Sequence, residues 1–275
     1  MFDLLLVSRG LLSVAKLESI IIQGLFDKQK SGACVRDIRF TYTPLGDSAI
    51  MIGLNFENAD SCSEMSGLVA DKIRALNMKG VTDIVPAFRQ LAVHYDPIHW
   101  MSSSSKTPYD EIVRYLNGKL NGIEVVLDAN DHKTVRIPVC YDKTVGLDLA
   151  ALSSTLKTSV SDLINLHHSK TYIVGAIGFA PGFAYLEGLD TLLTVSRRRE
   201  PRTRVPAGSV AVAGGYTGIY PSVLPGGWHI LGRTHASLFQ KTGSCGALLS
   251  VGDQVRFEPI SIEEFNAEQD LKEKQ

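Results

Sequence analysis

The sequence has no long hydrophobic run and, among 275 residues, only four cysteines. No apolar stretch reaches the roughly 20 residues needed to cross a bilayer, so we expect no membrane-spanning helix and no membrane partner. Cys34, Cys62, Cys140 and Cys245 include no C-x-x-C pair, which argues against a zinc site or a redox dithiol. So few cysteines in a chain of this length are typical of a reducing compartment. We therefore expect a cytoplasmic protein without a metal site.

The sequence also lacks an excess of charge of either sign. It contains 28 Lys and Arg residues against 29 Asp and Glu residues, which gives a formal net charge of -1 at pH 7. A nucleic-acid-binding surface needs a concentration of basic charge, so we expect no nucleic-acid partner. Hydrophobic residues make up 44% and charged residues 21% of the chain. This balance is ordinary for a globular protein, and the length fits one large domain or two small ones.

Several motifs of cofactor and catalytic sites are missing. The sequence has no G-x-x-x-x-G-K-[ST] phosphate loop, no G-x-G-x-x-G dinucleotide fingerprint and no H-E-x-x-H metal pair. It also lacks the G-x-S-x-G turn that presents a nucleophilic serine. If this chain takes part in nucleotide chemistry, it does so without a phosphate loop of its own.

A regular pattern of strands and helices begins near residue 38. Short β-type runs at 38–41, 48–54, 81–85 and 91–95 are separated by a helical pattern over 65–76, and a second helix is expected from Thr107, its N-cap, to residue 120. This order predicts a small α+β N-terminal domain over residues 37–127. Residues 1–36 precede the pattern, and we expect them to be an extension outside the fold.

The second half of the sequence changes in texture. After a polar linker at 128–133, a strand at 135–141 contains Pro138 and is expected to be an edge or terminal strand. Helices are expected at 147–156 and 160–168. Beyond Lys170, short strands at 172–177, 209–213, 229–232, 247–251 and 253–258 lie between Gly/Pro turns. This pattern predicts a mainly-β barrel or sandwich domain over 134–263, followed by a charged tail at 264–275 whose residues 268–275 are expected to be disordered.

The segment from Gly178 to Thr234 is the strongest candidate for a site. Glycines and prolines there build stiff loops in which backbone N–H groups can face a ligand. We expect Arg202 and Arg233 to hold an anionic group, because a guanidinium binds carboxylate or phosphate through two parallel bonds. The expected aromatic walls are Tyr185, Tyr220 and Trp228. The alternative is that the loops only turn corners of a barrel and the arginines form a solvated rim.

Three further side chains are candidates for chemistry. His167 ends a predicted helix just before this segment, so it is either a base or ligand contact or a histidine facing the helix C-terminal dipole. Ser209 and Thr217 can donate a hydrogen bond to an oxyanion, although the sequence reveals no base partner for either. The sequence therefore identifies no catalytic residue beyond the candidate His167.

The ordered motifs of this segment resemble one known family. They are G-F-x-P-G-F-x-Y-L at 178–186, P-R-x-x-V-P-A-G-S-V at 201–210, T-G-I-Y-P at 217–221, P-G-G-W at 225–228 and G-R-T at 232–234. Together with G-D-S-A at 46–49, Y-D-P at 95–97 and I-P-V-C-Y at 137–141, they are similar to the family of 5-oxoprolinase B subunits, allophanate hydrolase subunit 1 proteins and KipI-like kinase inhibitors. Ala184 stands where this family usually has Pro, and Tyr216 where Gln is common.

The resemblance implies a fold and a function. It implies that the barrel is cyclophilin-like, and that the chain is the B subunit of an ATP-dependent 5-oxoprolinase. Such an enzyme opens 5-oxoproline to glutamate with the help of a larger C subunit plus an A subunit, using ATP with Mg bound at, or shared with, one of these partners. The chain alone is then expected to be inactive. The resemblance leaves two alternatives: a histidine-kinase inhibitor, or a subunit related to allophanate hydrolase and urea carboxylase.

Overall fold

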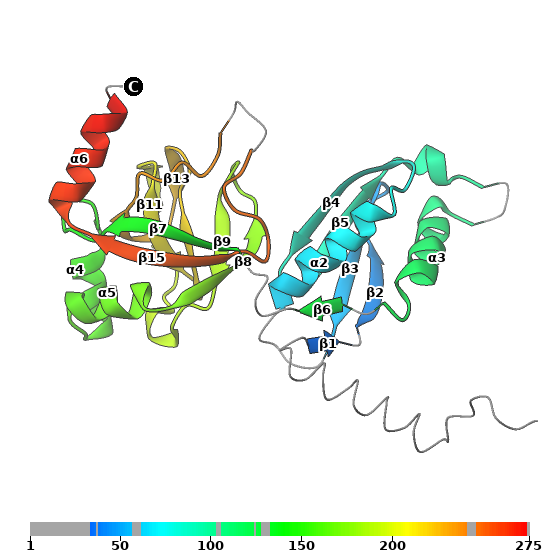
Figure 1. Ribbon diagram of the computed structural model, residues 1–275, viewed down its shortest axis with the longest axis horizontal. Helices are drawn as coiled ribbons and strands as arrows, with labels where there is room; N and C mark the ends of the chain where they lie inside the picture. Colours follow the sequence, from blue (N-terminus) through cyan, green and yellow to red (C-terminus); the bar gives the residue numbers. More distant parts are fainter. Residues whose placement is uncertain are drawn as a thin grey trace, which may run out of the picture.

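The computed structural model describes residues 34–36, 38–56, 62–102, 106–123, 125–127, 133–240 and 246–273. Most of the expected N-terminal extension and of the linker at 128–133 lies outside these residues. Two parts of the chain follow one another along the long axis of Figure 1, a helix-covered sheet and a barrel. No helix in the described residues combines the length and the apolar character that crossing a membrane requires.

The first part is an antiparallel sheet with two helices packed on it. Its strands pair in the order β2 (Arg39–Pro44), β3 (Ala49–Asn55), β5 (Gln90–Tyr95) and β4 (Val81–Ala87). Helices α2 (Cys62–Ala75) and α3 (Pro108–Leu120) share a buried core with this sheet, and a short 3-10 helix, η1 (Pro97–Trp100), precedes α3. Thr107 caps α3 as predicted, because its hydroxyl accepts a hydrogen bond from the Asp110 N–H at 3.2 Å.

The end of the predicted extension is part of the fold. Residues Cys34–Arg36 form strand β1, which pairs antiparallel with β6 (Val125–Leu127). The prediction that everything before residue 37 lies outside the fold is therefore corrected for these three residues. Residues 1–33 lie outside the described part of the chain.

The second part is a closed barrel of seven strands. Going round the ring, they are β7 (Thr134–Cys140), β14 (His229–Arg233), β11 (Ser209–Ala213), β12 (Tyr216–Ile219), β9 (Ala184–Glu187), β8 (Thr171–Ile177) and β15 (Gln254–Ile260). The ring closes because β15 pairs with β7 on one side and with β8 on the other. Helices α4 (Leu149–Leu156) and α5 (Val160–His168) lie beside the barrel, and the turn η2 (Thr191–Leu193) follows β9.

Strand β7 corrects the prediction of an edge strand. It pairs in parallel with β15 over the whole range from Thr134 to Cys140, and it also pairs with β14. The β14 pairing is limited to Arg233 opposite Cys140. Pro138 has no N–H to donate to a neighbouring strand. The sheet tolerates it because the pairing of β7 with β14 is limited to one residue pair.

Two other predictions in the C-terminal part are wrong. Residues 247–251 form no strand, and only Ala247 makes an isolated bridge, to Phe239. The tail expected to be disordered instead forms helix α6 (Ile262–Glu273). Ser261 and Glu264 cap its start reciprocally, and Phe265 is buried with its ring stacked 4.0 Å from that of His235. A capped end and one buried anchor give this charged segment its helix.

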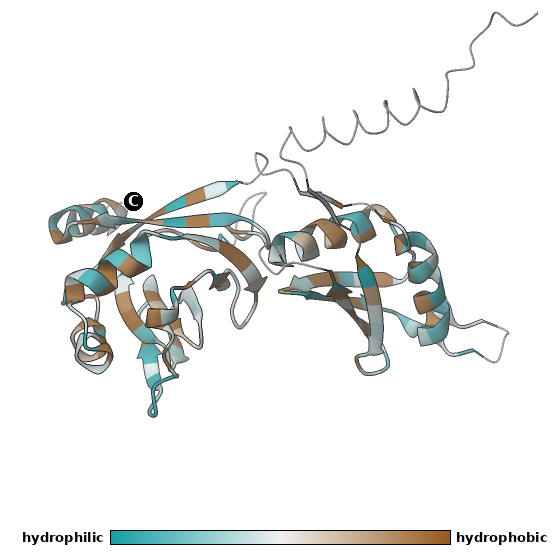
Figure 2. Ribbon diagram, turned by 90° about the horizontal axis from the view of Figure 1, so that it is seen from below, coloured by the Kyte–Doolittle hydropathy of each residue, from teal (hydrophilic) through white to brown (hydrophobic). Residues whose placement is uncertain are grey.

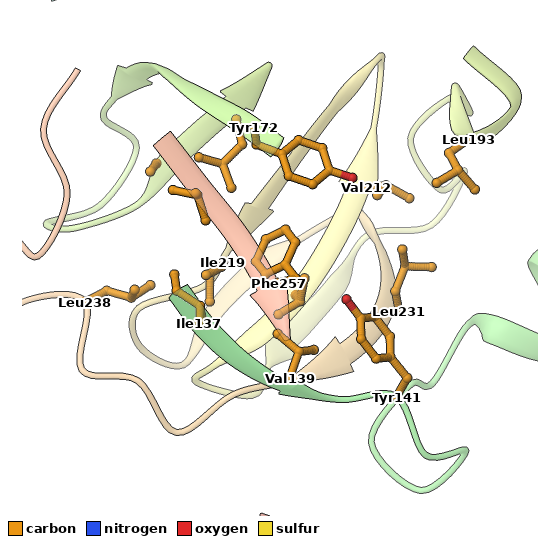
Figure 3. Close-up of a cluster of buried hydrophobic side chains, with 14 of the residues drawn as sticks. Ile137, Val139, Tyr141, Tyr172, Leu193, Val212, Ile219, Leu231, Leu238 and Phe257 are labelled. Atoms are coloured by element: carbon orange, nitrogen blue, oxygen red, sulfur yellow. The ribbon is translucent and has the colours of Figure 1, made fainter. Parts of the chain in front are cut away.

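Strand alternation sorts the barrel side chains into two groups. Val210, Val212 and Ile219 point into the interior, where they pack with Leu231 and Phe257 (Figure 3). Their neighbours Ala211, Ala213 and Tyr220 belong to a separate cluster on the outer face of the same strands. Elsewhere in the molecule, where one face of a strand meets solvent, brown and teal bands alternate along the strand (Figure 2).

Strands β4 and β8 join the two parts. Ala87 of β4 pairs with Ala176 of β8, and the Phe88 N–H donates to the Gly175 carbonyl at 2.7 Å. The pairing makes the sheet continuous from β2 to β15. Because one sheet runs through both parts, strand pairing alone does not separate them into domains. The division at residues 127–134 stays a prediction.

Candidate functional site

The outer face of strands β9, β12, β11 and β14 carries a connected group of aromatic rings, which we call the aromatic surface. Its buried floor is Phe183, Tyr220 and Trp228, and its more accessible rings are Phe88, Phe179, Tyr185 and Tyr216. Phe183 is central, with ring centroids 4.9 Å from Tyr185, 5.4 Å from Tyr220 and 5.6 Å from Trp228. Most of these pairs meet edge to face, the arrangement that the charge distribution of aromatic rings favours.

The predicted walls therefore lie together, and one ring of the surface, Phe88, comes from outside the segment that the sequence singled out. Tyr185, Tyr220 and Trp228 all belong to the aromatic surface, but Tyr220 and Trp228 are its floor and not its walls. Phe88 comes from the turn between β4 and β5, with its ring 5.2 Å from that of Tyr216 and 6.4 Å from that of Tyr185. Nothing in the sequence around Phe88 signals this contact, since its partners are about a hundred residues away.

Phe179 is held in an unusual conformation at the edge of this surface. Its φ angle is +70°, in the region that side chains other than glycine rarely adopt, and it is 61% exposed. Two backbone bonds fix the loop, from the Gly178 N–H to the Phe183 carbonyl and from the Phe183 N–H to the Ala180 carbonyl. The loop is thus held by its own backbone hydrogen bonds, and it presents an aromatic ring to solvent.

Arg202 binds a carboxylate of its own chain. Its two terminal nitrogens each donate to one oxygen of Asp148, both at 2.8 Å, and Arg198 donates to Asp148 Oδ1 at 2.8 Å. The Ile230 N–H completes the set at 2.7 Å. Burial raises the pKa of Asp148, but the Arg202 and Ile230 hydrogen bonds and the two arginine charges outweigh burial, so the pKa lies below its usual range.

This pairing changes the role assigned to the arginines. The two N–H groups of Arg202 that we expected to bind a ligand anion instead bind Asp148. This ion pair attaches strand β10 (Arg202–Val205) to the barrel. Opposite β10 lies β13 (Leu224–Gly226), and together they run over Tyr220. Arg233 donates from Nε to the Ala207 carbonyl at 2.8 Å and does not join Arg202 in one anion site.

His167 lies inside the barrel, away from the aromatic surface. Its Nδ1 is 2.8 Å from the Tyr141 hydroxyl and its Nε2 is 2.9 Å from Thr217 Oγ1, and its ring stacks on Phe257 at 4.7 Å. Thr217 donates its own hydroxyl proton to the Ala211 carbonyl. We therefore assign the tautomer with the proton on Nε2, which donates to Thr217 while Nδ1 accepts from Tyr141.

The burial of this histidine keeps it neutral. Its side chain has no exposed area, and desolvation, with a smaller contribution from the charge of His168, lowers the pKa of His167 to about 3. The rings of Tyr141 and Tyr172, labelled in Figure 3, pack around it. The expected helix-dipole environment is thus replaced by a closed hydrogen-bond chain, and His167 has no path to a ligand on the outer face.

The hydroxyl candidates are buried as well. Thr217 is fully buried inside the barrel, and Ser209 is 1% exposed, with its backbone N–H bonded to the Pro206 carbonyl. The structure brings Thr217 together with His167, a pairing that the sequence did not reveal because 50 residues separate them. No group of three or more His, Cys, Asp or Glu side chains that could hold a metal occurs in the described part of the chain.

A cleft lies at the junction of the two parts. Its volume is about 490 Å³, and it is formed by α2, β4, the end of β8 and residues 247–251. Ile177, which lines it, directly precedes the loop that carries Phe179. The cleft and the aromatic surface share no lining residue, but each includes residues of the two parts of the chain.

Comparison with known proteins finds relatives that match most of the chain. The family model described as the carboxyltransferase domain, subdomains C and D, matches residues 40–249. The B subunit of 5-oxoprolinase from Bacillus subtilis (strain 168) is 33% identical over 233 residues, which cover 84% of this chain and 97% of that protein. The one from Escherichia coli O157:H7 is 43% identical over 129 residues, covering 47% of this chain and 59% of that protein.

Solved structures agree with this relationship. The crystal structure of TTHA0988 matches with a TM-score of 0.62 and 32% identity, covering 82% of this chain and 40% of that one. The Kluyveromyces lactis urea amidolyase matches with a TM-score of 0.62 over 15% of its length, at 19% identity, which shows a shared fold alone. This chain therefore belongs to the carboxyltransferase-domain family that includes the 5-oxoprolinase B subunits.

Proposed function

We propose that this chain is the B subunit of an ATP-dependent 5-oxoprolinase, which opens 5-oxo-L-proline to L-glutamate with the help of a larger C subunit plus an A subunit. The observation that carries the proposal is the 33% identity to the Bacillus subtilis B subunit over 97% of that protein. We also propose that the two parts of the chain are an α+β domain and a cyclophilin-like barrel domain.

The aromatic surface is the part of this chain that suits such a substrate. The lactam ring of 5-oxoproline is compact and itself uncharged, although the molecule carries a carboxylate beside it. Rings such as Phe88, Tyr185 and Tyr216 offer apolar faces and edges for the lactam ring to pack on. A lactam is also a stable amide. Transfer of a phosphoryl group to its carbonyl oxygen would make the carbonyl carbon a better electrophile, which explains the use of ATP.

We place ATP and Mg at a site on, or shared with, a partner subunit. The sequence of this chain has no phosphate loop, and its described residues present no carboxylate cluster for a cation. The role that we assign to this chain is to bind and orient the lactam ring. The proposal therefore requires a stable complex and predicts negligible turnover by the isolated chain.

Reconstitution tests this proposal. The chain is co-purified with the A and C subunits from its own source, and glutamate release from 5-oxoproline is measured with and without ATP. We expect ATP-dependent release by the full set and none by any single protein. A complex that forms but does not open 5-oxoproline would contradict the proposal, as would robust activity of the isolated chain. ATP-dependent turnover of urea or allophanate, or inhibition of a histidine kinase, would favour one of the alternatives.

A further inference from the structure

One carboxylate stands at an end of the aromatic surface. Glu187 is the last residue of β9, two positions after Tyr185, so both side chains point to the outer face of the strand. Ser63, near the start of α2 and only 1% exposed, donates a hydrogen bond to Glu187 Oε2. A buried hydroxyl from the first part of the chain thus fixes the orientation of a carboxylate on the barrel.

The surroundings of this carboxylate are aromatic. A Cβ atom placed on Gly175 would lie 2.6 Å from Phe88 Cε1 and 3.0 Å from Glu187 Cγ, so both side chains cover the same glycine. Burial raises the pKa of Tyr216, and the negative charge of Glu187 adds to this rise, which places the carboxylate near that hydroxyl as well. Glu187 therefore adjoins Phe88, Tyr185 and Tyr216 at once.

Glu187 makes no ion pair within the described part of the chain, and its Oε1 atom has no hydrogen bond there. It is half-buried, and a half-buried carboxylate gains most from an N–H donor or a cation. Aromatic faces beside it attract positive charge too. The chemistry of this position suits a ligand nitrogen that carries hydrogen.

We propose that Glu187, held by Ser63, binds the ring nitrogen of 5-oxoproline and the ammonium group that this nitrogen becomes in glutamate. The inference rests on the proposed function and assigns a residue to it. The lactam N–H is a neutral donor, whereas the product nitrogen carries a positive charge. A carboxylate binds an ammonium group more strongly than a neutral N–H. The contribution of Glu187 is therefore larger for the product than for the substrate.

The test compares three ligands of the reconstituted complex. They are 5-oxoproline, glutamate, and the lactone analogue in which a ring oxygen replaces the N–H. In Glu187→Gln the amide oxygen can still accept the Ser63 hydrogen bond, but the negative charge is gone. We expect the inhibition constant of glutamate to rise about tenfold or more and the KM for the lactam substrate about threefold. The inhibition constant of the lactone should stay within about twofold, because it has no N–H to lose.

Two further variants complete the test. Ser63→Ala keeps the carboxylate of Glu187 but removes the hydrogen bond that orients it. It should weaken glutamate binding by a smaller factor than Glu187→Gln does, and the effect should again be largest for glutamate, smaller for the lactam and smallest for the lactone. Glu258→Gln is the matched control, since Glu258 lies on β15 and pairs with Arg136 at 2.6 Å. Its three constants should equal those of the unmodified complex. Melting temperatures verify that each variant is folded.

The outcomes separate the two proposals. If the unmodified complex releases no glutamate, the proposed function itself fails. If that complex is active but Glu187→Gln leaves the glutamate constant within about twofold, or weakens the lactone as much as glutamate, the assignment of Glu187 is wrong and the proposed function stands. Should Glu187→Gln fail to fold, an unchanged glutamate constant in Ser63→Ala overturns the assignment.

Discussion

The two faces of strand β12 carry opposite kinds of chemistry. On the inner face, Thr217 closes a hydrogen-bond chain with His167 and Tyr141 in which every polar atom has a partner. On the outer face, Tyr216 and Tyr220 belong to a cluster of rings that reaches solvent at Phe179. Residues adjacent in sequence thus belong either to the closed interior of the barrel or to the partly accessible ring cluster, according to the face they occupy.

Removing one large side chain from each face should give the largest difference between the faces. Phe183→Ala on the outer face and Leu186→Ala on the inner face should each lower the free energy of unfolding by about 3–5 kcal/mol, because both side chains are buried. Only Phe183→Ala should also reduce turnover per folded complex. Denaturant unfolding and activity assays measure the two quantities. A loss of turnover in Leu186→Ala equal to that in Phe183→Ala would remove the distinction between the faces.

The buried carboxylate under the arginines gives the next largest effect. Asp148→Asn leaves Arg198 and Arg202 without their anion and should cost about 2–3 kcal/mol in unfolding experiments. The pKa of Asp148 is lowered in the folded state, so its stabilisation is present above pH 3.8 and is lost as the pH falls through the folded pKa. Glu200→Gln removes a charge from the same segment and should change stability little. A small effect of Asp148→Asn would show that the arginines are a solvated rim.

The inner face should respond to pH in a predictable way. Because the folded-state pKa of His167 is about 3 and its ordinary value is 6.5, the unfolded chain binds one more proton between these limits. The free energy of unfolding should therefore fall as the pH drops below 6.5, by about 1.4 kcal/mol per pH unit from this group. His167→Gln should remove that slope. If urea unfolding at several pH values gives the same slope in both proteins, His167 is not buried and neutral.

The smallest expected effect comes from the exposed ring of the aromatic surface. Phe179→Gly removes a side chain that is mostly in solvent and supplies the residue that prefers a positive φ. The free energy of unfolding should change by less than about 1 kcal/mol. A fall in melting temperature like that of Phe183→Ala would mean that the ring belongs to the core. The matched variant Leu192→Gly also removes an exposed side chain, but from a position without this strain.

The sequence predicted the elements whose signals are local. The helix over 108–120 was predicted from its Thr107 cap and its apolar stripe. The helix over 160–168 was predicted as well, and both occur within one residue of the expected limits. Helix α6 was missed because its stability depends on the contact of Phe265 with His235, 30 residues away. Strands β9 and β12 were missed because Gly/Pro motifs that suggest loops also contain short strands.

The candidate site was predictable as a segment but not as an arrangement. The motifs named Tyr185, Tyr220 and Trp228, and these rings do lie together. The partner of Arg202 is Asp148, whose position in a turn before α4 gave no sign of this role. Which of two adjacent residues faces inward also depends on strand register, and register is set by pairing between distant segments.

Closure of the barrel by β15 has a consequence for synthesis of the chain. The first two barrel strands to leave the ribosome, β7 and β8, are not each other's neighbours, because β15 fills the place between them. Until residues 254–260 are available, both strands expose unpaired edges. The barrel therefore cannot close until β15 has been synthesised, and a product truncated before residue 254 would carry two open edges ready for aggregation.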